Sequence, residues 1–182
     1  MLLRGGLILA AALLCSSFAP AQQTFDRLCL QTAPSFDGMS EAARAYGGHV
    51  AEPPFPDPRF FAWLSPSDQQ EAWISEPEAG PSSWYAGIAS GMFASAQAKA
   101  CFVSVHGDHA EVARDLSQNF DLVPFAAPTE GALNTTFQAW TTVIRGRVVL
   151  IILRWPTTMS TGVWITALVP EGPVAPGNLT GL

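Results

Sequence analysis

Positive charge is scarce in this sequence. A single lysine, Lys99, and eight arginines stand against 15 acidic residues, and the formal net charge is −6. Nucleic acids and anionic membranes bind proteins chiefly through Lys and Arg, so we expect no nucleic-acid partner. The near absence of lysine beside abundant alanine, glycine and proline indicates a GC-rich bacterial genome.

Long apolar runs are also missing after residue 21. A membrane-spanning helix needs about 20 consecutive apolar residues, so we expect no stable membrane insertion of residues 22–182. Before that point, Arg4 precedes the apolar stretch Leu7–Leu14 and the small residues Ala19-Pro20-Ala21. This order is typical of a secretory signal peptide. We predict cleavage near Ala21 and a periplasmic or extracellular mature protein.

Cysteine is scarce as well. Cys15 lies in the predicted signal peptide, and Leu14 stands where a lipidation site requires a small residue. Only Cys29 and Cys101 remain after export. An even pair of cysteines in a small exported domain usually forms a disulfide, and we expect one here. The absence of a C-x-x-C motif argues against a redox role.

The common catalytic motifs are absent. The sequence has no G-x-S-x-G, G-x-x-x-x-G-K-[ST], G-x-G-x-x-G or H-E-x-x-H pattern. The paired acids Glu76 and Glu78 flank a proline, and they fit a solvated loop better than a glycosidase pair, which requires two carboxylates across a cleft. We therefore expect no cofactor and, on balance, no enzyme.

Hydrophobic periodicity nevertheless predicts a folded domain. Apolar residues recur every three to four positions in the predicted helices and form apolar runs in the predicted strands. In chain order we predict helices at 24–32 and 37–46, a proline-rich loop at 52–58, a strand at 59–64, a helical turn from 65–68, strands at 84–93 and 100–106, a helix at 108–119, and strands at 135–144, 148–155 and 162–169. An Ala-rich helix over 92–100 also fits the composition.

The segment Val148–Leu153 is apolar at every position. A strand with two apolar faces must be covered on both sides, so we place it in the middle of a sheet. We expect helix 108–119 to cover one face and the N-terminal half, tied in through Cys29 and Cys101, to cover the other.

The fold class predicted is α+β. A strand–helix–three-strand C-terminal unit forms a mainly antiparallel sheet, and N-terminal helices pack on it. We expect one domain over residues 22–169, preceded by the signal peptide at 1–21, and a poorly ordered tail at 170–182.

The segment His106-Gly107-Asp108-His109 joins the strand to the helix at 100–119. Asp108 fits a helix N-cap and Glu111 completes a D-x-x-E capping box, so a structural joint explains most of the segment. The alternative is a reactive site, with His106 and His109 as catalytic groups or with His106, Asp108 and His109 as metal ligands. We expect no metal, because the spacing matches no known zinc motif.

Six tryptophans and a group of arginines supply candidates for ligand binding. Three of the tryptophans come from successive predicted strands and can align across the sheet, although tryptophan is more often a core residue. The arginines fall near one predicted hairpin at 144–147. The candidate ligand-binding residues are Trp140, Trp155, Trp164, Arg145 and Arg147, with Arg154 in the same basic cluster.

These observations favour an exported, disulfide-braced, non-catalytic binding or accessory domain. Its partner is an unidentified protein or small ligand, and the sequence leaves the oligomeric state open. The first alternative is a metal-dependent hydrolase that uses His106 and His109. The second is a structural role in which Val148–Leu153 completes a sheet between chains.

Overall fold

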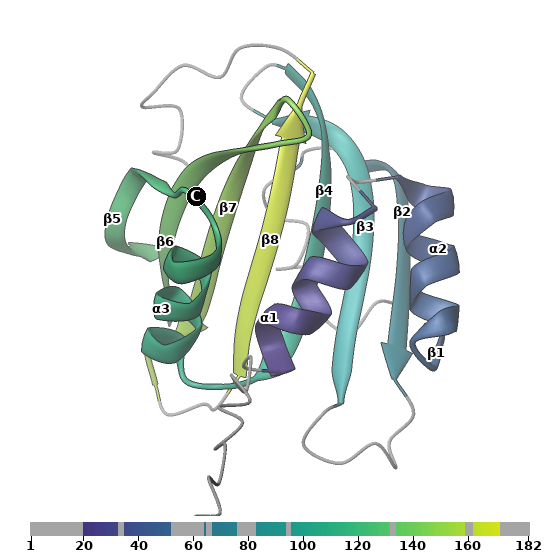
Figure 1. Cartoon of the computed structure of the whole chain (residues 1–182), viewed down its shortest axis with the longest axis horizontal. Coiled ribbons are helices and arrows are strands. Elements are labelled where there is room, and N and C mark those ends of the chain that lie inside the picture. The colour runs from purple at the N-terminus through teal and green to yellow at the C-terminus, as the bar shows by residue number, and fades with distance from the viewer. Residues whose placement is uncertain are drawn as a thin grey trace, which may run out of the picture.

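The computed structural model describes residues 20–32, 35–51, 64, 67–75, 83–93, 96–131, 134–158 and 162–171. Within them, eight strands form one antiparallel sheet in the order β1-β2-β3-β4-β8-β7-β6-β5, and helices pack on one of its faces (Figure 1). The elements are α1 (Pro20–Phe25), the π-helix η1 (Asp26–Leu30), α2 (Phe36–Ala45), β1 (Gly48–Val50), β2 (Ser67–Ser75), β3 (Trp84–Phe93), β4 (Ala96–His106), α3 (His109–Asn119), β5 (Val123–Gly131), β6 (Thr135–Ile144), β7 (Arg147–Pro156) and β8 (Gly162–Pro170).

The broad prediction of a mainly antiparallel α+β fold is confirmed. Strands β3 and β6 have the predicted bounds, and β7, β8 and α3 differ by a residue at most at each end. No helix in the described ranges is long and apolar enough to cross a membrane.

The predicted strand–helix–three-strand unit is wrong in its strand number, because it does not include β5. This strand contains Pro124 and Pro128, which cannot donate to a hydrogen-bond ladder. The structure accommodates them at the edge of the sheet, where β5 pairs only with β6 and two irregularities interrupt the register. The two prolines therefore argued against a strand in the sequence, although an edge strand needs backbone donors on only one side.

A second prediction fails at the start of β2. The sequence predicts a helical turn that includes residues 67 and 68, but these residues belong to a strand that pairs with β3 along nearly its whole length. Pairing with a neighbouring strand outweighs a local helix-capping signal. The predicted elements at 52–58 and 59–63, like residues 1–19 and 172–182, lie outside the described residues, and Leu64 is not in a strand.

The sheet is covered by apolar side chains on both faces. On the face that carries the helices, here called the helix face, the cluster contains Phe25, Leu28, Met39, Val112 and Leu116 from the helices and Trp73, Ile88, Cys101, Val103, Ile151 and Ile165 from the strands. The opposite face carries Leu64, Phe93, Phe102, Phe137, Leu150, Ile152 and Leu168. Strand β7 contributes to both clusters, which explains its uninterrupted apolar sequence.

The predicted division of the two faces is incorrect, because the N-terminal helices and α3 cover the same face (Figure 1). Alternate residues of a strand point to opposite faces. Cys101 therefore points to the same side as Val103 and Val105, which belong to the cluster that contains α3 residues. Since Cys29 is bonded to Cys101, η1 must lie on that side too. Among the described residues before β2, Leu64 joins the opposite cluster.

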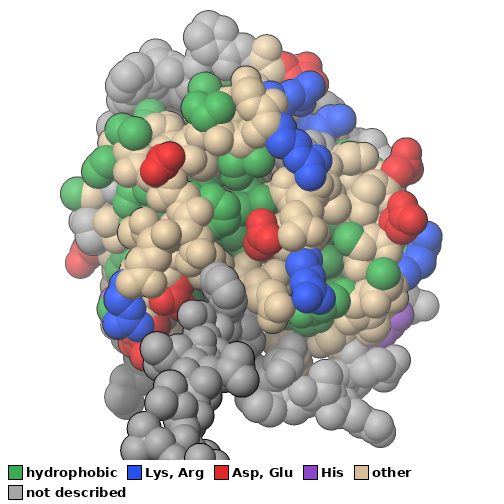
Figure 2. Space-filling model, viewed as in Figure 1, with side chains coloured by type: hydrophobic (Ala, Val, Ile, Leu, Met, Phe, Trp, Pro, Cys, Tyr) green, Lys and Arg blue, Asp and Glu red, His purple; other side chains and the backbone are tan. Residues whose placement is uncertain are grey.

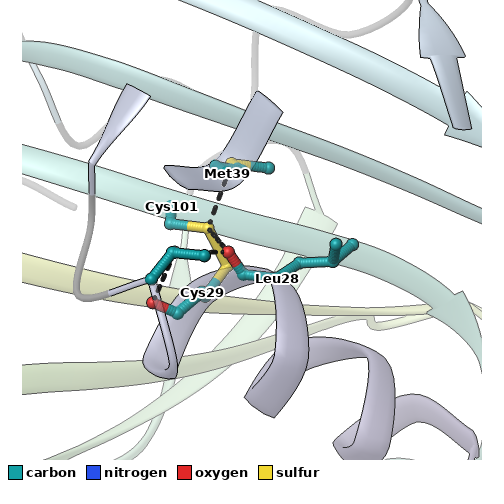
Figure 3. The surroundings of a disulfide bond; sticks show 5 residues. Leu28, Cys29, Met39 and Cys101 are labelled. Atoms are coloured by element: carbon teal, nitrogen blue, oxygen red, sulfur yellow. Dashed lines mark hydrogen bonds between the residues drawn. A yellow bond between two sulfur atoms is a disulfide. The ribbon is translucent and has the colours of Figure 1, made fainter. Parts of the chain in front are cut away.

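The predicted disulfide between Cys29 and Cys101 is present, with the two Cα atoms 5.4 Å apart. Both cysteines are fully buried, and the Sγ atom of Cys101 lies 3.5 Å from Sδ of Met39 in α2 (Figure 3). Cys29 belongs to the single π-turn of η1, in which the Gln31 amide donates to the Asp26 carbonyl five residues earlier. The bond thus fixes η1 to the middle of β4, and Met39 of α2 packs against it.

Candidate functional site

Two ends of the sheet hold the residues singled out from the sequence. The joint end is the one at which β4 leads into α3, β7 ends and β8 begins. The hairpin end is the one at which β6 turns into β7, β4 begins and β8 ends. The candidate histidines lie at the joint end and the two candidate arginines at the hairpin end.

At the joint end, Asp108 is the N-cap of α3. One of its carboxylate oxygens, Oδ1, accepts hydrogen bonds from the amides of Ala110, at 2.9 Å, and Glu111, at 3.1 Å. The Glu111 carboxylate lies 3.9 Å from the Arg114 guanidinium. Asp108 therefore satisfies amides at the helix N-terminus, and a metal bound through Oδ1 would compete with that cap.

The two histidines of the joint belong to different faces. Alternation along β4 places His106 on the side of Phe102, which is the opposite face. The imidazole of His109 instead stacks on Trp155, with ring centroids 4.5 Å apart and planes 9° apart, and Trp155 packs against the helix-face cluster. Among the described residues, no group of three His, Cys, Asp or Glu side chains is placed to hold a metal ion.

The three candidate tryptophans do not form one row. Trp140 is 5% exposed and belongs to the helix-face cluster, and Trp155 packs at the edge of the same cluster. Trp164 lies on the opposite face, because it pairs with Arg154 of β7, which in turn pairs with Phe137 of the opposite-face cluster. Trp140 and Trp155 therefore have core or near-core positions, and Trp164 is half-buried.

The predicted basic cluster is also divided. Arg145 and Arg147 are exposed at the hairpin end, whereas Arg154 is at the other end of β7 and only 6% exposed. Arg147 and Arg154 are seven residues apart on an extended strand, a separation of about 23 Å, so the three guanidinium groups cannot act together. Arg154 instead lies between Phe137 and Trp164 in the strand register, a juxtaposition that the sequence did not predict.

The turn at the hairpin end has an unusual sequence. Both of its central residues, Arg145 and Gly146, have positive φ, at 52° and 76°, as in a type I′ turn. Asn, Asp and Gly are the residues that favour the first of these positions. An arginine there costs about 1 kcal/mol of backbone strain. The predicted hairpin is confirmed. Its first turn position holds Arg145, although Asn, Asp or Gly would adopt the same backbone conformation with less strain.

A small apolar hollow, which the sequence did not reveal, lies beside this hairpin on the helix face. Its wall comes from η1 and its floor from β6, β7 and β8, and it is lined by Cys29, Leu30, Ile144, Arg147, Val149, Ala167 and Val169. Figure 2 shows hydrophobic side chains at the centre of this face, with both basic and acidic side chains around them. No local motif marks the hollow, because its lining comes from four separate elements.

A second depression lies between η1 and the end of α3, and polar side chains line it. These groups bond to one another: Gln31 Nε2 donates to Asp26 Oδ2 at 2.7 Å, and Asn119 Nδ2 donates to Gln22 Oε1 at 3.2 Å. Its polar lining is therefore at least partly committed to internal contacts. The hairpin end is the better candidate for binding.

Comparison of the chain with protein-family models, curated proteins and solved structures returns no match in any of the three. The functional interpretation therefore depends on the residues and their geometry.

Proposed function

We propose that this chain is an exported binding or accessory domain that uses the hairpin end of its sheet to contact a partner. Arg145 and Arg147 are exposed there, and two exposed valines, Val143 and Val148, face one another across β6 and β7. The valines are 66% and 57% exposed, and strand alternation places them on the opposite face of this end, whereas Arg147 lies on the helix face. Exposed apolar and cationic side chains around one end of the sheet are the observation that carries the proposal, because such mixtures are typical of interaction surfaces.

Export is part of the same proposal. The N-terminal pattern of a charged residue, a short apolar stretch and a small-residue site supports it. The buried Cys29–Cys101 bond is compatible with an oxidising compartment. N-terminal sequencing of the mature protein should begin at Gln22, and a chain without residues 1–21 should remain in the cytoplasm with both thiols reduced.

Site-specific photo-crosslinking in the producing cells tests the binding role. The photoreactive residue p-benzoylphenylalanine should replace Val148 on the opposite face of the hairpin end, exposed Gln97 on its helix face and, as a control, exposed Ala110 at the joint end. We expect a discrete adduct from position 97, position 148 or both, and none from position 110. Equal labelling from all three positions, or no adduct from either position 97 or position 148, would exclude binding through the hairpin end.

A further inference from the structure

The hollow at the hairpin end is built from buried side chains and one exposed cation. Leu30, Val149 and Val169 are each at most 6% exposed, Ile144 is half-buried at the edge, and Arg147 is the exposed residue of the lining. The wall is held in place by the Cys29–Cys101 bond. The hollow is therefore a feature of the folded core rather than a gap between mobile side chains.

The size of the hollow excludes a small-molecule site. The enclosed volume is about 10 Å³, which is room for about one water molecule. Pockets for small ligands usually enclose about 300–1,000 Å³. A hollow this shallow can seat the end of one apolar side chain, provided that the rest of the partner lies over the surrounding surface. A macromolecular partner satisfies that condition.

Charge indicates the chemistry of the partner. Arg147 lines the hollow, Arg145 precedes it in the turn, and Lys99 is the cross-strand neighbour of Val169. Among the described residues, no carboxylate lies within 4.0 Å of these three cations, although Glu171 follows β8 at this end. A local excess of positive charge on a chain of net charge −6 favours an acidic partner.

A symmetric dimer fits this surface less well than an acidic partner does. In a two-fold contact the same patch meets itself, so Arg145, Arg147 and Lys99 of one copy would face the same cations of the other. A membrane also fits poorly, because the apolar residues of the hollow are recessed and cannot insert between lipids.

We propose that the hollow binds one apolar side chain of an acidic protein segment, while Arg147, Arg145 and Lys99 pair with carboxylates on either side of that anchor. This inference rests on the proposed binding function and specifies its partner. An apolar anchor within a charged rim is the usual arrangement of a protein interface.

Peptide selection tests the inference even while the natural partner is unidentified. A phage-displayed library of random peptides should be selected on the oxidised mature protein. Enriched peptides are then measured against wild type, Arg147→Glu and the matched control Arg44→Glu, which makes the same charge change on exposed α2. We expect enrichment of Asp and Glu around one apolar residue. Arg147→Glu should weaken binding at least tenfold, and Arg44→Glu less than about twofold.

Other results would overturn the inference. They are enriched peptides without acidic residues, peptides that bind both variants equally, and the absence of any enrichment. Sedimentation of the protein with anionic phosphatidylglycerol vesicles, lost in Arg147→Glu, would identify a membrane as the occupant. A wild-type dimer that Arg147→Glu dissociates in analytical ultracentrifugation would identify a second copy.

The two proposals fail in different ways. If position 97 or position 148 crosslinks to a partner in cells and Arg147→Glu leaves the adduct unchanged, the binding function stands and the acidic-segment inference is wrong. If no adduct forms from either position, the proposed function itself is wrong.

Discussion

Polar and charged residues have different roles at the joint end and at the hairpin end of the sheet. At the joint end, Asp108 caps α3 and His109 stacks on Trp155. At the hairpin end, Arg145 and Arg147 are exposed and make no ion pair within the described ranges. The comparison shows that a polar residue indicates a binding site only where its side chain has no structural role within the fold. The residue type alone does not reveal whether it has such a role.

The largest effect is expected from the bond that supports the hairpin end. Replacing both Cys29 and Cys101 with alanine opens a loop of 72 residues and should lower the free energy of unfolding by about 4 kcal/mol. Urea denaturation followed by tryptophan fluorescence measures this change. A double variant as stable as the oxidised wild type would show that η1 does not need the bond to form the wall of the hollow.

The two ends of β7 allow a direct comparison of two arginines. Arg154→Ala should lower the free energy of unfolding by about 2–3 kcal/mol, because a buried side chain is lost from between Phe137 and Trp164. Arg147→Ala should change it by less than about 0.5 kcal/mol, because that side chain is exposed. If urea denaturation gave the two variants equal losses of unfolding free energy, Arg154 would not have the structural role that separates it from Arg147.

The capping role of Asp108 can be separated from a chemical role. Asp108→Ala should lower the free energy of unfolding by about 1 kcal/mol, and Asp108→Asn should restore most of that loss because asparagine caps equally well. The measurement is thermal unfolding followed by far-UV circular dichroism. A bound metal ion released by Asp108→Asn, detected by mass spectrometry of the native protein, would instead favour a metal site.

The smallest effect concerns the strain at the hairpin turn. Arg145→Asn should raise the free energy of unfolding by about 0.5 kcal/mol in urea denaturation, because asparagine tolerates positive φ better than arginine. The same variant should weaken binding of acidic peptides, because it removes one of the cations beside the hollow. A variant that gains stability and keeps full affinity would remove Arg145 from the proposed surface.

Predictions from local patterns succeeded where a single segment contains the whole signal. Asp108 and Glu111 mark the start of α3, and apolar runs on either side of a two-residue turn mark β6 and β7. Strand β3 was predicted despite Gly87, and the structure explains that glycine: a Cβ atom there would lie 2.5 Å from the Phe102 ring. Even a correct strand prediction did not reveal this contact, because Phe102 is on another strand.

The functional residues were predicted less well than the strands. The sequence identified Arg145 and Arg147 as candidates, but it grouped them with Arg154 and treated three tryptophans as one possible row. Distance along β7 separates the arginines, and the alternation of strand faces separates Trp164 from Trp140 and Trp155. Sequence order alone does not specify which side chains share a face of the sheet or lie at the same end of it.

The sequence by itself determined the mainly antiparallel α+β class, the approximate bounds of α3, β6, β7 and β8 and the two cysteines available for a bond, because each depends on local periodicity, turn chemistry or residue count. Tertiary structure decided which face the helices cover, where β5 and β2 pair and which side chains surround the hollow. Those features depend on contacts between residues far apart in the chain. The direction in which Cys101 points from β4 determines the side on which η1 lies, and so places the apolar hollow beside Arg147.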